Sequence, residues 1–472
     1  MIYYRKLYSQ LLKWKNSSNH KPLIIRGARQ VGKSTLVQEF GKEFRYFINL
    51  NLERTPDKNF FTKLDNAADL INAIFLSKGI PLSDDPTLVF IDEIQESPQA
   101  IKMLRYFYED YPDLYFIAAG SLLEFALKKV TSFPVGRVKQ LVLHPFDFEE
   151  FLLALNKKDL ASELEKIPVA EYAHNSILDL FHDYAITGGM PEVVKRYAEE
   201  KNMINLGEIY ENLWQSYRDD VEKYASNATE RKIIRHIINT APFEKDRITF
   251  SGFGNSNYRS REVGEALRCL DMARIIEVIY PATVVVPPAA PNLRRRPRLQ
   301  FVDTGLLNYA IGHQAEMIGL NDLNNFHRGR IIQHLTTQQL QAQQSSPVYK
   351  PLFWVREKTN SNAEIDLLYQ YKKYMIPIEI KSGGHGTIRS LHQFLEEADH
   401  KFGIRLYAES FSVESLKTPR GIPYLLMNLP YYVSSRIPQY VEWFVENHME
   451  DRRRKLRNDV TKSSPRLRPH AG

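Results

Sequence analysis

The sequence predicts an α/β protein built from several domains. At 472 residues it is long for one domain, and the usual domain size suggests roughly two to four units. In the first third, apolar runs of strand length alternate with helical patterns, the order that builds a parallel sheet covered by helices. A helical middle follows, and then a second stretch in which helices and strands alternate. We therefore expect two α/β units separated by a mostly helical region.

The first unit is indicated by five short apolar runs, each bounded by polar or turn residues. They occupy residues 22–27, 44–51, 87–93, 114–121 and 139–146. From about Pro145 to Tyr224 the pattern changes, because apolar residues recur three and four apart, which is typical of helices with one buried face. The helices predicted there cover residues 146–155, 174–186 and 206–224.

The second half repeats both patterns. Two helices, at 230–241 and 260–273, precede a strand, a basic turn and another strand before Ala310. From about Asn325 onward a helix at 329–343 leads into strands at 351–357, 363–371, 375–382 and 403–410. This order predicts a second α/β unit at the end of the chain.

The charge of the chain lies mostly at its end. Residues 450–472 hold eight Lys/Arg and three Asp/Glu, which is +5 of the net +7. A single cysteine, Cys269, excludes an internal disulfide, and no Cys/His cluster has zinc-like spacing. The sequence has neither an apolar run of membrane-spanning length nor the pattern of a secretion signal. We expect a cytoplasmic protein without a membrane segment, whose tail is solvated or contacts phosphates.

A phosphate-binding loop lies between the first predicted strand and the helix that follows it. Its glycines allow backbone N–H groups to turn toward phosphate oxygens, while a lysine neutralises the β and γ phosphates and a serine hydroxyl coordinates Mg²⁺. The pattern G-x-x-x-x-G-K-[ST] is matched by Gly27, Ala28, Arg29, Gln30, Val31, Gly32, Lys33 and Ser34, with Thr35 next. We predict that these residues bind ATP.

An acidic pair ends the strand at 87–93. Asp92 is placed to hold Mg²⁺, and Glu93 to activate a water for attack on the γ-phosphate. Ser121, at the end of the following strand, is a candidate for positioning that water, since strand ends of a parallel sheet meet at one edge. Arg137 is a candidate arginine finger, acting in its own subunit or in a neighbouring one of a homo-oligomer, with an ordinary surface arginine as the alternative.

Together these motifs resemble the AAA+ type ATPases of bacteria and archaea that carry a C-terminal domain of unknown function. The resemblance runs from about residue 3 to 430 and includes "FIDEIQ", "AAGS", "GGMPEVV" at Gly188, "YRDDVEKY" at Tyr217 and "FVDTGLLNYAIG" at Phe301. It implies an ATPase core at 1–145, a helical lid at 146–225, a winged-helix-like domain at 226–320 and a nuclease-like domain at 321–448. A basic tail at 449–472 follows.

The winged-helix-like segment has a basic turn that suits phosphate contacts. The arginines of this wing are Arg294, Arg295, Arg296 and Arg298. Because the helix at 260–273 also carries Glu262, Glu265 and Asp271, a hairpin that packs against protein is the alternative to DNA binding.

The last unit resembles the PD-(D/E)XK nuclease pattern. Side chains alternate along a strand, so Asp366 lies on one face of its strand, and Glu379 and Lys381 share a face of the next. The resemblance implies that the two carboxylates bind Mg²⁺ while Lys381 orients or activates the attacking water. Gln333 stands where the family more often has a glutamate, and an amide is a weaker ligand for this cation. A cross-strand salt bridge in a binding domain is the alternative.

These predictions favour an enzyme that hydrolyses ATP with Mg²⁺ and acts as a switch or motor. Its C-terminal half is expected to bind DNA or a protein partner, with the wing arginines and the tail as the phosphate contacts. An ATP-dependent DNA nuclease and a nucleotide-gated scaffold with little turnover are the alternatives.

Overall fold

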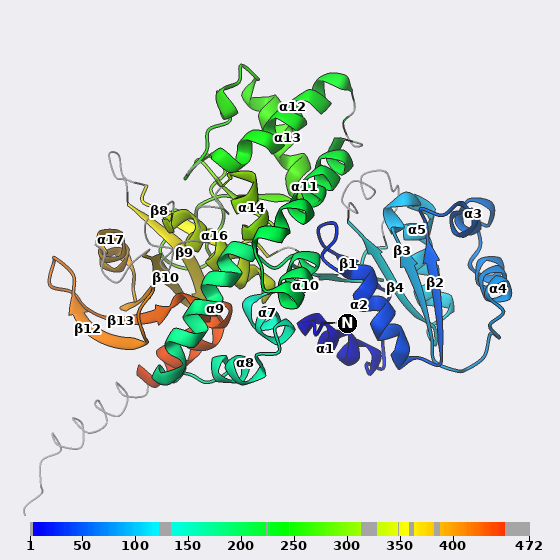
Figure 1. The fold of residues 1–472 in the computed structure, drawn as a ribbon, viewed down its shortest axis with the longest axis horizontal. Helices are drawn as coiled ribbons and strands as arrows, with labels where there is room; N and C mark the ends of the chain where they lie inside the picture. Colours follow the sequence, from blue (N-terminus) through cyan, green and yellow to red (C-terminus); the bar gives the residue numbers. More distant parts are fainter. Residues whose placement is uncertain are drawn as a thin grey trace, which may run out of the picture.

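The computed structural model describes residues 3–121, 134–222, 225, 227–244, 246–312, 328–347, 349–357, 363–381 and 388–448. A parallel sheet lies on the right of Figure 1, a mixed sheet lies on the left, and helices fill the region between them. This arrangement confirms the α/β class predicted from the sequence. The predicted basic tail at 449–472 lies outside the described residues.

The N-terminal sheet is parallel and has the strand order β2-β3-β4-β1-β5. The inner strands β1, β3 and β4 are almost wholly buried, which explains their continuous apolar runs, whereas the edge strands β2 and β5 are partly exposed. Ile25 of β1 contributes to the core beneath α1 and α2, whereas Ile24 faces the core beneath α3, α4 and α5. The elements are α1 (Lys6–Lys15), β1 (Leu23–Arg26), α2 (Lys33–Phe40), β2 (Tyr46–Asn51), α3 (Thr55–Lys63), α4 (Ala67–Lys78), β3 (Thr87–Asp92), α5 (Pro98–Asp110), β4 (Tyr115–Gly120) and β5 (Lys139–Val142).

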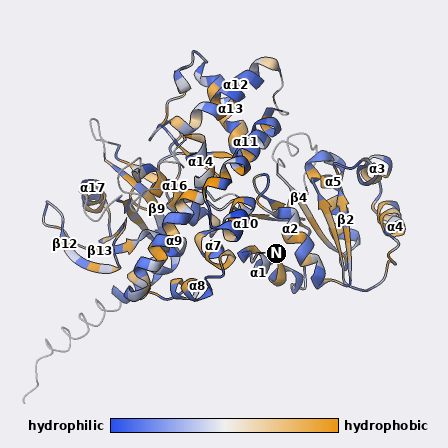
Figure 2. Ribbon diagram, in the orientation of Figure 1, coloured by the Kyte–Doolittle hydropathy of each residue, from blue (hydrophilic) through white to orange (hydrophobic). Residues whose placement is uncertain are grey.

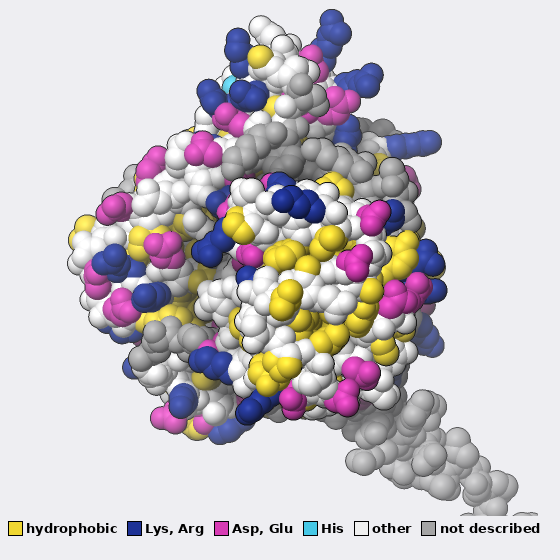
Figure 3. All heavy atoms as spheres, turned by 90° about the vertical axis from the view of Figure 1, so that its right-hand side faces the viewer, with side chains coloured by type: hydrophobic (Ala, Val, Ile, Leu, Met, Phe, Trp, Pro, Cys, Tyr) yellow, Lys and Arg dark blue, Asp and Glu magenta, His cyan; other side chains and the backbone are white. Residues whose placement is uncertain are grey.

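Hydrophobic residues are concentrated in the strands of this sheet and on the inner faces of its helices (Figure 2). The outer face, which is turned to the viewer in Figure 3, also carries hydrophobic side chains between charged ones. Leu76 of α4 is the most exposed large apolar residue in the described part of the chain, at 83%.

The middle of the chain is helical, as the spacing of its apolar residues predicts. Its first helix begins at a capping box, because the Asp147 side chain accepts from the backbone N–H of Glu150 while the Glu150 side chain accepts from that of Asp147. Both carboxylates also pair with α1 or the residue before it, since Lys6 binds Asp147 and Arg5 binds Glu150. The helices are α7 (Phe148–Ala154), α8 (Lys158–Leu164), α9 (His174–Thr187), α10 (Pro191–Glu200) and α11 (Gly207–Glu222).

Two further helices and a two-stranded hairpin follow, in the predicted order of helix, helix, strand, turn and strand. The hairpin strands pair antiparallel, with Ile276 opposite Phe301 and Ile279 opposite Arg298. The helices α12 and α13 stand at the top of Figure 1. The elements are α12 (Ala228–Thr240), α13 (Ser260–Met272), β6 (Ile276–Ile279), β7 (Arg298–Phe301) and α14 (Thr304–Ala310).

The C-terminal sheet is mixed and has the order β12-β13-β11-β10-β9-β8. The neighbours β10, β11 and β13 run parallel, while the outer pairs are antiparallel. The sequence predicted α16 and the first four strands, but neither α17 nor the antiparallel pair β12 and β13. The elements are α16 (Arg328–Ala342), β8 (Leu352–Val355), β9 (Glu364–Tyr371), β10 (Tyr374–Ile380), α17 (Arg389–Glu397), β11 (Phe402–Tyr407), β12 (Ser412–Lys417) and β13 (Pro423–Pro430).

One hydrophobic cluster connects these parts. It includes Leu11 of α1, Tyr217 of α11, Leu267 of α13 and Ile404 of β11, each 1% exposed or less. The two sheets are therefore joined through a continuous core. None of the helices in the described part of the chain is long and apolar enough to cross a membrane.

Candidate functional site

The phosphate-binding loop joins β1 to α2. Gly27 has a φ of +154° and lies so close to the segment after β5 that a Cβ would come within 2.3 Å of the backbone oxygen of Leu143. Gly32 is the N-cap of α2 with a φ of +93°, and Gln30 between them also has a positive φ, of 63°. Only glycine tolerates the first two positions without strain, so the shape of the loop accounts for both glycines of the motif.

Lys33 is the first residue of α2, and its side chain folds back over the loop. Its Nζ donates to the backbone oxygens of Gly27 at 3.1 Å and Ala28 at 2.8 Å. Burial lowers the pKa of Lys33 to about 8, against the opposing effect of the nearby Glu93 and Asp92 carboxylates. The structure thus holds a buried amine inside the loop, where the charge of a phosphate would favour its protonated form.

Asp92 and Ser34 lie together at the end of β3. The Asp92 carboxylate accepts a hydrogen bond from the Ser34 side chain, while burial raises the pKa of this carboxyl. Among the described residues no three His, Cys, Asp or Glu side chains form a metal cluster. Mg²⁺ at nucleotide sites does not need one, since it uses one or two protein oxygens together with phosphates and water. A carboxylate and a hydroxyl in contact fit that requirement.

Glu93 follows in the left-handed region, with a φ of 53°. Its Oε2 accepts a hydrogen bond of 2.5 Å from Nε2 of Gln95. Gln95 in turn packs against β4, since a Cβ on Gly120 would lie 2.2 Å from its Oε1. Sequence reasoning did not identify Gln95, although it lies in the "FIDEIQ" motif. The neighbouring Ser121 is buried directly after β4, at the same edge of the sheet.

Arg137 lies at the opposite edge of the sheet. It precedes β5, whose first residue, Lys139, is paired with Leu23 at the beginning of β1, whereas the phosphate loop follows the end of β1. The Arg137 side chain is exposed and its Nε lies 2.9 Å from Oε1 of Glu109, at the end of α5. The length of β1, at about 3.3 Å a residue, therefore separates Arg137 from the phosphate loop of its own subunit.

Two other parts of the chain hold the outside of the loop. Tyr217 of α11 donates its hydroxyl to the backbone oxygen of Arg29 at 3.0 Å, and Asp220 of the same helix pairs with the Arg29 guanidinium at 2.5 Å. Arg5, before α1, donates to the backbone oxygen of Val31 at 2.8 Å. The sequence pointed to Tyr217 and Asp220 only through the "YRDDVEKY" motif, with no role assigned.

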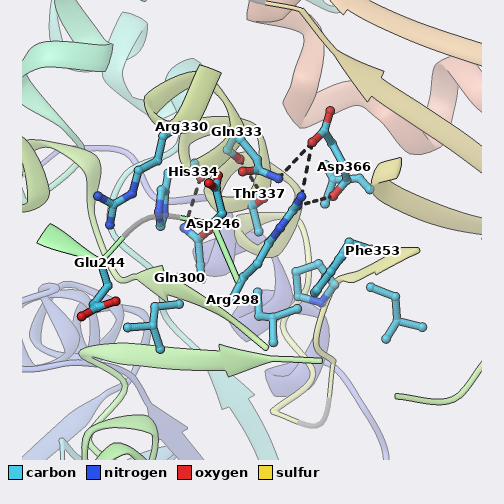
Figure 4. Close-up of a pocket in the computed structure, with 15 residues that line it drawn as sticks. Glu244, Asp246, Arg298, Gln300, Arg330, Gln333, His334, Thr337, Phe353 and Asp366 are labelled. Atoms are coloured by element: carbon cyan, nitrogen blue, oxygen red, sulfur yellow. Dashed lines mark hydrogen bonds and ion pairs between the residues drawn. The ribbon is translucent and has the colours of Figure 1, made fainter. Parts of the chain in front are cut away.

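The wing arginines divide into two groups. Arg294, Arg295 and Arg296 lie in the loop between β6 and β7 and are at least partly exposed. The prediction that Arg298 joins them as a phosphate contact is wrong, because it is the first residue of β7 and only 15% of its side chain is exposed. It points away from the loop, toward the C-terminal sheet (Figure 4).

Arg298 inserts between the β6–β7 hairpin and β9. It pairs with Glu364, its Nη2 lies 3.6 Å from Oδ1 of Asp366, and its guanidinium stacks 4.3 Å from the Phe353 ring centre. Arg247 pairs with the other oxygen of Glu364 at 2.9 Å. Alternation along β9 places Glu364 and Asp366 on one face, and two arginines from outside the sheet neutralise that face.

The remaining nuclease-like residues lie beside this contact. The Asp366 carboxylate accepts from Nε2 of Gln333 at 3.1 Å and from the backbone N–H of Ile380 at 2.8 Å. Glu379 pairs with Lys381 at 2.6 Å, and burial together with the Asp366 charge raises the pKa of Glu379 to about 7.

The structure therefore brings Asp366, Glu379 and Lys381 together, as predicted, but their surroundings do not suit Mg²⁺. An arginine and the N–H₂ of an amide face Asp366, where a cation would need oxygen atoms. Figure 4 shows Arg298 and Gln333 converging on Asp366 from two sides.

The N-terminal part of the chain matches a known domain family. Residues 19–152 match the AAA domain family and form an AAA-type P-loop domain. Residues 178–317 and 328–425 match two families that are each described as a domain of unknown function, DUF8612 and DUF4143. No curated protein matches the chain.

Several solved structures are similar to the chain at low identity. The Walker-type ATPase PABY2304 of Pyrococcus abyssi is 16% identical over 66% of this chain and 96% of its own, with a TM-score of 0.43. The Aeropyrum pernix ORC1 protein, solved in complex with DNA, is 12% identical over 67% and 93%, with a TM-score of 0.28. C. elegans PCH-2 is 13% identical over 43% and 64%, with a TM-score of 0.27.

Proposed function

We propose that this protein is a Mg²⁺-dependent ATPase that acts as a switch or motor. The observation that carries the proposal is the meeting of Lys33, Ser34, Asp92 and Glu93 at the carboxyl edge of one parallel sheet. Such an edge, with a helix N-terminus behind it, is where α/β sheets bind phosphates.

Each residue has a distinct role in hydrolysis. Lys33 neutralises the β and γ phosphates, and Ser34 with Asp92 holds the Mg²⁺ that bridges them. Glu93 accepts a proton from the attacking water, while Gln95 holds its carboxylate in place. Ser121, buried at the same edge, is placed to orient the water.

Two variants test this proposal. Lys33→Ala should abolish nucleotide binding, because the loop loses its only lysine. Glu93→Gln should bind ATP and lose roughly two orders of magnitude or more in turnover, the range for a lost general base. A matched control is Glu96→Gln, since Glu96 lies in the same turn but pairs with Lys58 on the surface. Wild-type turnover in both test variants would exclude this site.

For the C-terminal half we propose binding of DNA or a protein partner without metal-dependent cleavage. The supporting observation is that Arg298 and Gln333 occupy the surroundings of Asp366. A cleavage assay on single-stranded and duplex DNA with Mg²⁺ or Mn²⁺ tests it. Cleavage that disappears in Asp366→Ala would instead establish the ATP-dependent nuclease.

The scaffold alternative differs from the switch in its turnover. A Glu93→Gln protein mixed with ATP should retain the partner that the wild type releases after hydrolysis. Identical retention by both proteins, with wild-type turnover near zero, would favour a scaffold whose assembly depends on bound nucleotide alone.

A further inference from the structure

We propose that Tyr217 and Asp220 of α11 are positioning residues that set the shape of the phosphate loop and couple ATP binding to the region beyond α11. The inference rests on the proposed ATPase and names how that same site is regulated. Side chains from outside the loop hold two of its backbone oxygens, those of Arg29 and Val31.

The orientation of these carbonyl groups fixes the orientation of the N–H groups that follow. In a trans peptide the C=O of one residue and the N–H of the next point in opposite directions. Tyr217 draws the Arg29 oxygen outward, so the N–H of Gln30 points to the other side, into the loop. Arg5 does the same for Val31 and thereby for the N–H of Gly32. These are the groups with which such a loop binds phosphate.

Asp220 adds a second contact from the same helix. Its side chain is 5% exposed and lies 2.5 Å from Nη1 of Arg29, whose own side chain is 38% exposed. Asp220 is also one of the carboxylates whose charge acts on Lys33. Because α11 contacts the loop through both the Tyr217 hydroxyl and the Asp220 carboxylate, a movement of α11 changes the shape of the loop.

Other residues of α11 contact elements that lie away from the phosphate loop. Trp214 donates its Nε1–H to the backbone oxygen of Leu306 in α14 at 3.0 Å, and Tyr210 donates to Thr187 at the end of α9 at 2.7 Å. Gly305 packs against the same segment, since a Cβ there would lie 2.2 Å from the Thr187 oxygen. One helix thus joins the phosphate loop to two other segments, which carry "GGMPEVV" at 188–194 and "FVDTGLL" at 301–307.

The test compares Tyr217→Phe and Asp220→Asn with the wild type. Both changes nearly preserve volume. Tyr217→Phe removes the hydrogen bond to the backbone oxygen of Arg29, and Asp220→Asn removes the charge that pairs with the Arg29 guanidinium. We expect the KM for ATP and the Kd of a fluorescent ATP analogue to rise about three- to tenfold, the effect of one lost hydrogen bond, while kcat changes less than twofold. Asp219→Asn is the control, because Asp219 directly precedes Asp220 on α11 but accepts its hydrogen bond from Gln215 of the same helix.

Hydrogen exchange provides the second measurement. ATP should slow exchange in α14 of the wild type and of Asp219→Asn, and this protection should be smaller in Tyr217→Phe and Asp220→Asn at saturating nucleotide. Wild-type KM and wild-type protection in both variants would overturn the inference, as would a fall in kcat alone. Failure of the ATPase itself would be distinguishable, because the wild type would then show no turnover that depends on Lys33.

Discussion

Arg298 of β7 and Asp366 of β9 lie 3.6 Å apart between Nη2 and Oδ1, although 68 residues separate them in the sequence. Glu364, two residues before Asp366, contacts the same guanidinium. The β6–β7 hairpin and the C-terminal sheet are therefore joined by an ion-paired cluster at the place where a metal-dependent nuclease would need its cation.

Arg298→Ala should destabilise the protein, because it leaves two largely buried carboxylates without their main counter-ion. We expect a loss of about 3 kcal/mol in the free energy of unfolding, the lower part of the range for breaking a buried ion pair. Urea denaturation measures it. Arg294→Ala, in the exposed loop, should change stability by less than about 0.5 kcal/mol. Adding Glu364→Gln to Arg298→Ala should recover part of the loss, and no recovery would contradict the pairing.

Glu379→Gln should stabilise the protein at pH 8 more than at pH 5. The folded pKa of about 7 lies above the ordinary value, so ionised Glu379 weakens the folded state. That penalty is absent below about pH 4.5, grows as the pH rises toward 7 and is complete above it. The gain at pH 8 has an upper limit of about 3 kcal/mol, reduced because Lys381 loses its partner. Melting temperatures at the two pH values measure it, and equal changes would refute it.

ATP affinity should fall as the pH rises above 8. The buried Lys33 has a pKa of about 8 without nucleotide, and phosphate binding favours its protonated form, so the free protein must take up a proton at higher pH. We expect the Kd of a non-hydrolysable ATP analogue to rise about tenfold between pH 7 and pH 9. Lys33→Arg keeps its charge throughout this range, so any binding that it retains should not vary with pH. The same slope in both proteins would exclude Lys33 as its source.

Arg137 should influence hydrolysis only across a subunit boundary. It lies at the edge of the sheet opposite the phosphate loop, so a γ-phosphate that it meets belongs to a neighbour. Mixing Arg137→Ala with Glu93→Gln should then restore part of the turnover lost by each, because some interfaces combine two intact residues. Wild-type turnover of Arg137→Ala alone would leave it as the surface partner of Glu109.

Removing the charges of Arg294, Arg295 and Arg296 together should weaken any binding to duplex DNA and reduce its salt dependence. Each lost phosphate contact lowers the slope of log K against log salt by about 0.9. Arg298→Gln should leave this slope unchanged, since its guanidinium is already paired inside the protein. Deleting residues 450–472 tests the tail separately. Absence of binding by the wild type at low salt would point to a protein partner.

Much of the nucleotide site could be predicted because its signals are local. A glycine is required where the backbone takes a positive φ or passes close to another segment of the backbone, and Gly27 and Gly32 meet these conditions. Asp92 ends a strand that is buried throughout, and Glu93 follows it directly. Gln95 was missed because its role depends on β4, which lies beside it only in the folded sheet.

The positions of the arginines could not be predicted from local signals. Arg294 and Arg298 are similar in a basic sequence, yet one is exposed and the other is buried against two carboxylates. Nothing within the segment distinguishes them, because the difference arises where β7 begins and from the approach of β9. Likewise, Arg137 could not be placed relative to the phosphate loop until the register of β5 against β1 was known.

By itself the sequence determined the α/β class, most of the strands, several of the longer helices, and the phosphate loop with its acidic pair, since hydrophobic periodicity and backbone sterics act over a few neighbouring residues. The tertiary structure decided that α11 holds the loop, that Arg137 lies away from it, and that Arg298 neutralises Asp366 and Glu364. These contacts join residues far apart in the chain. Their geometry depends on how whole elements pack, which no local pattern specifies.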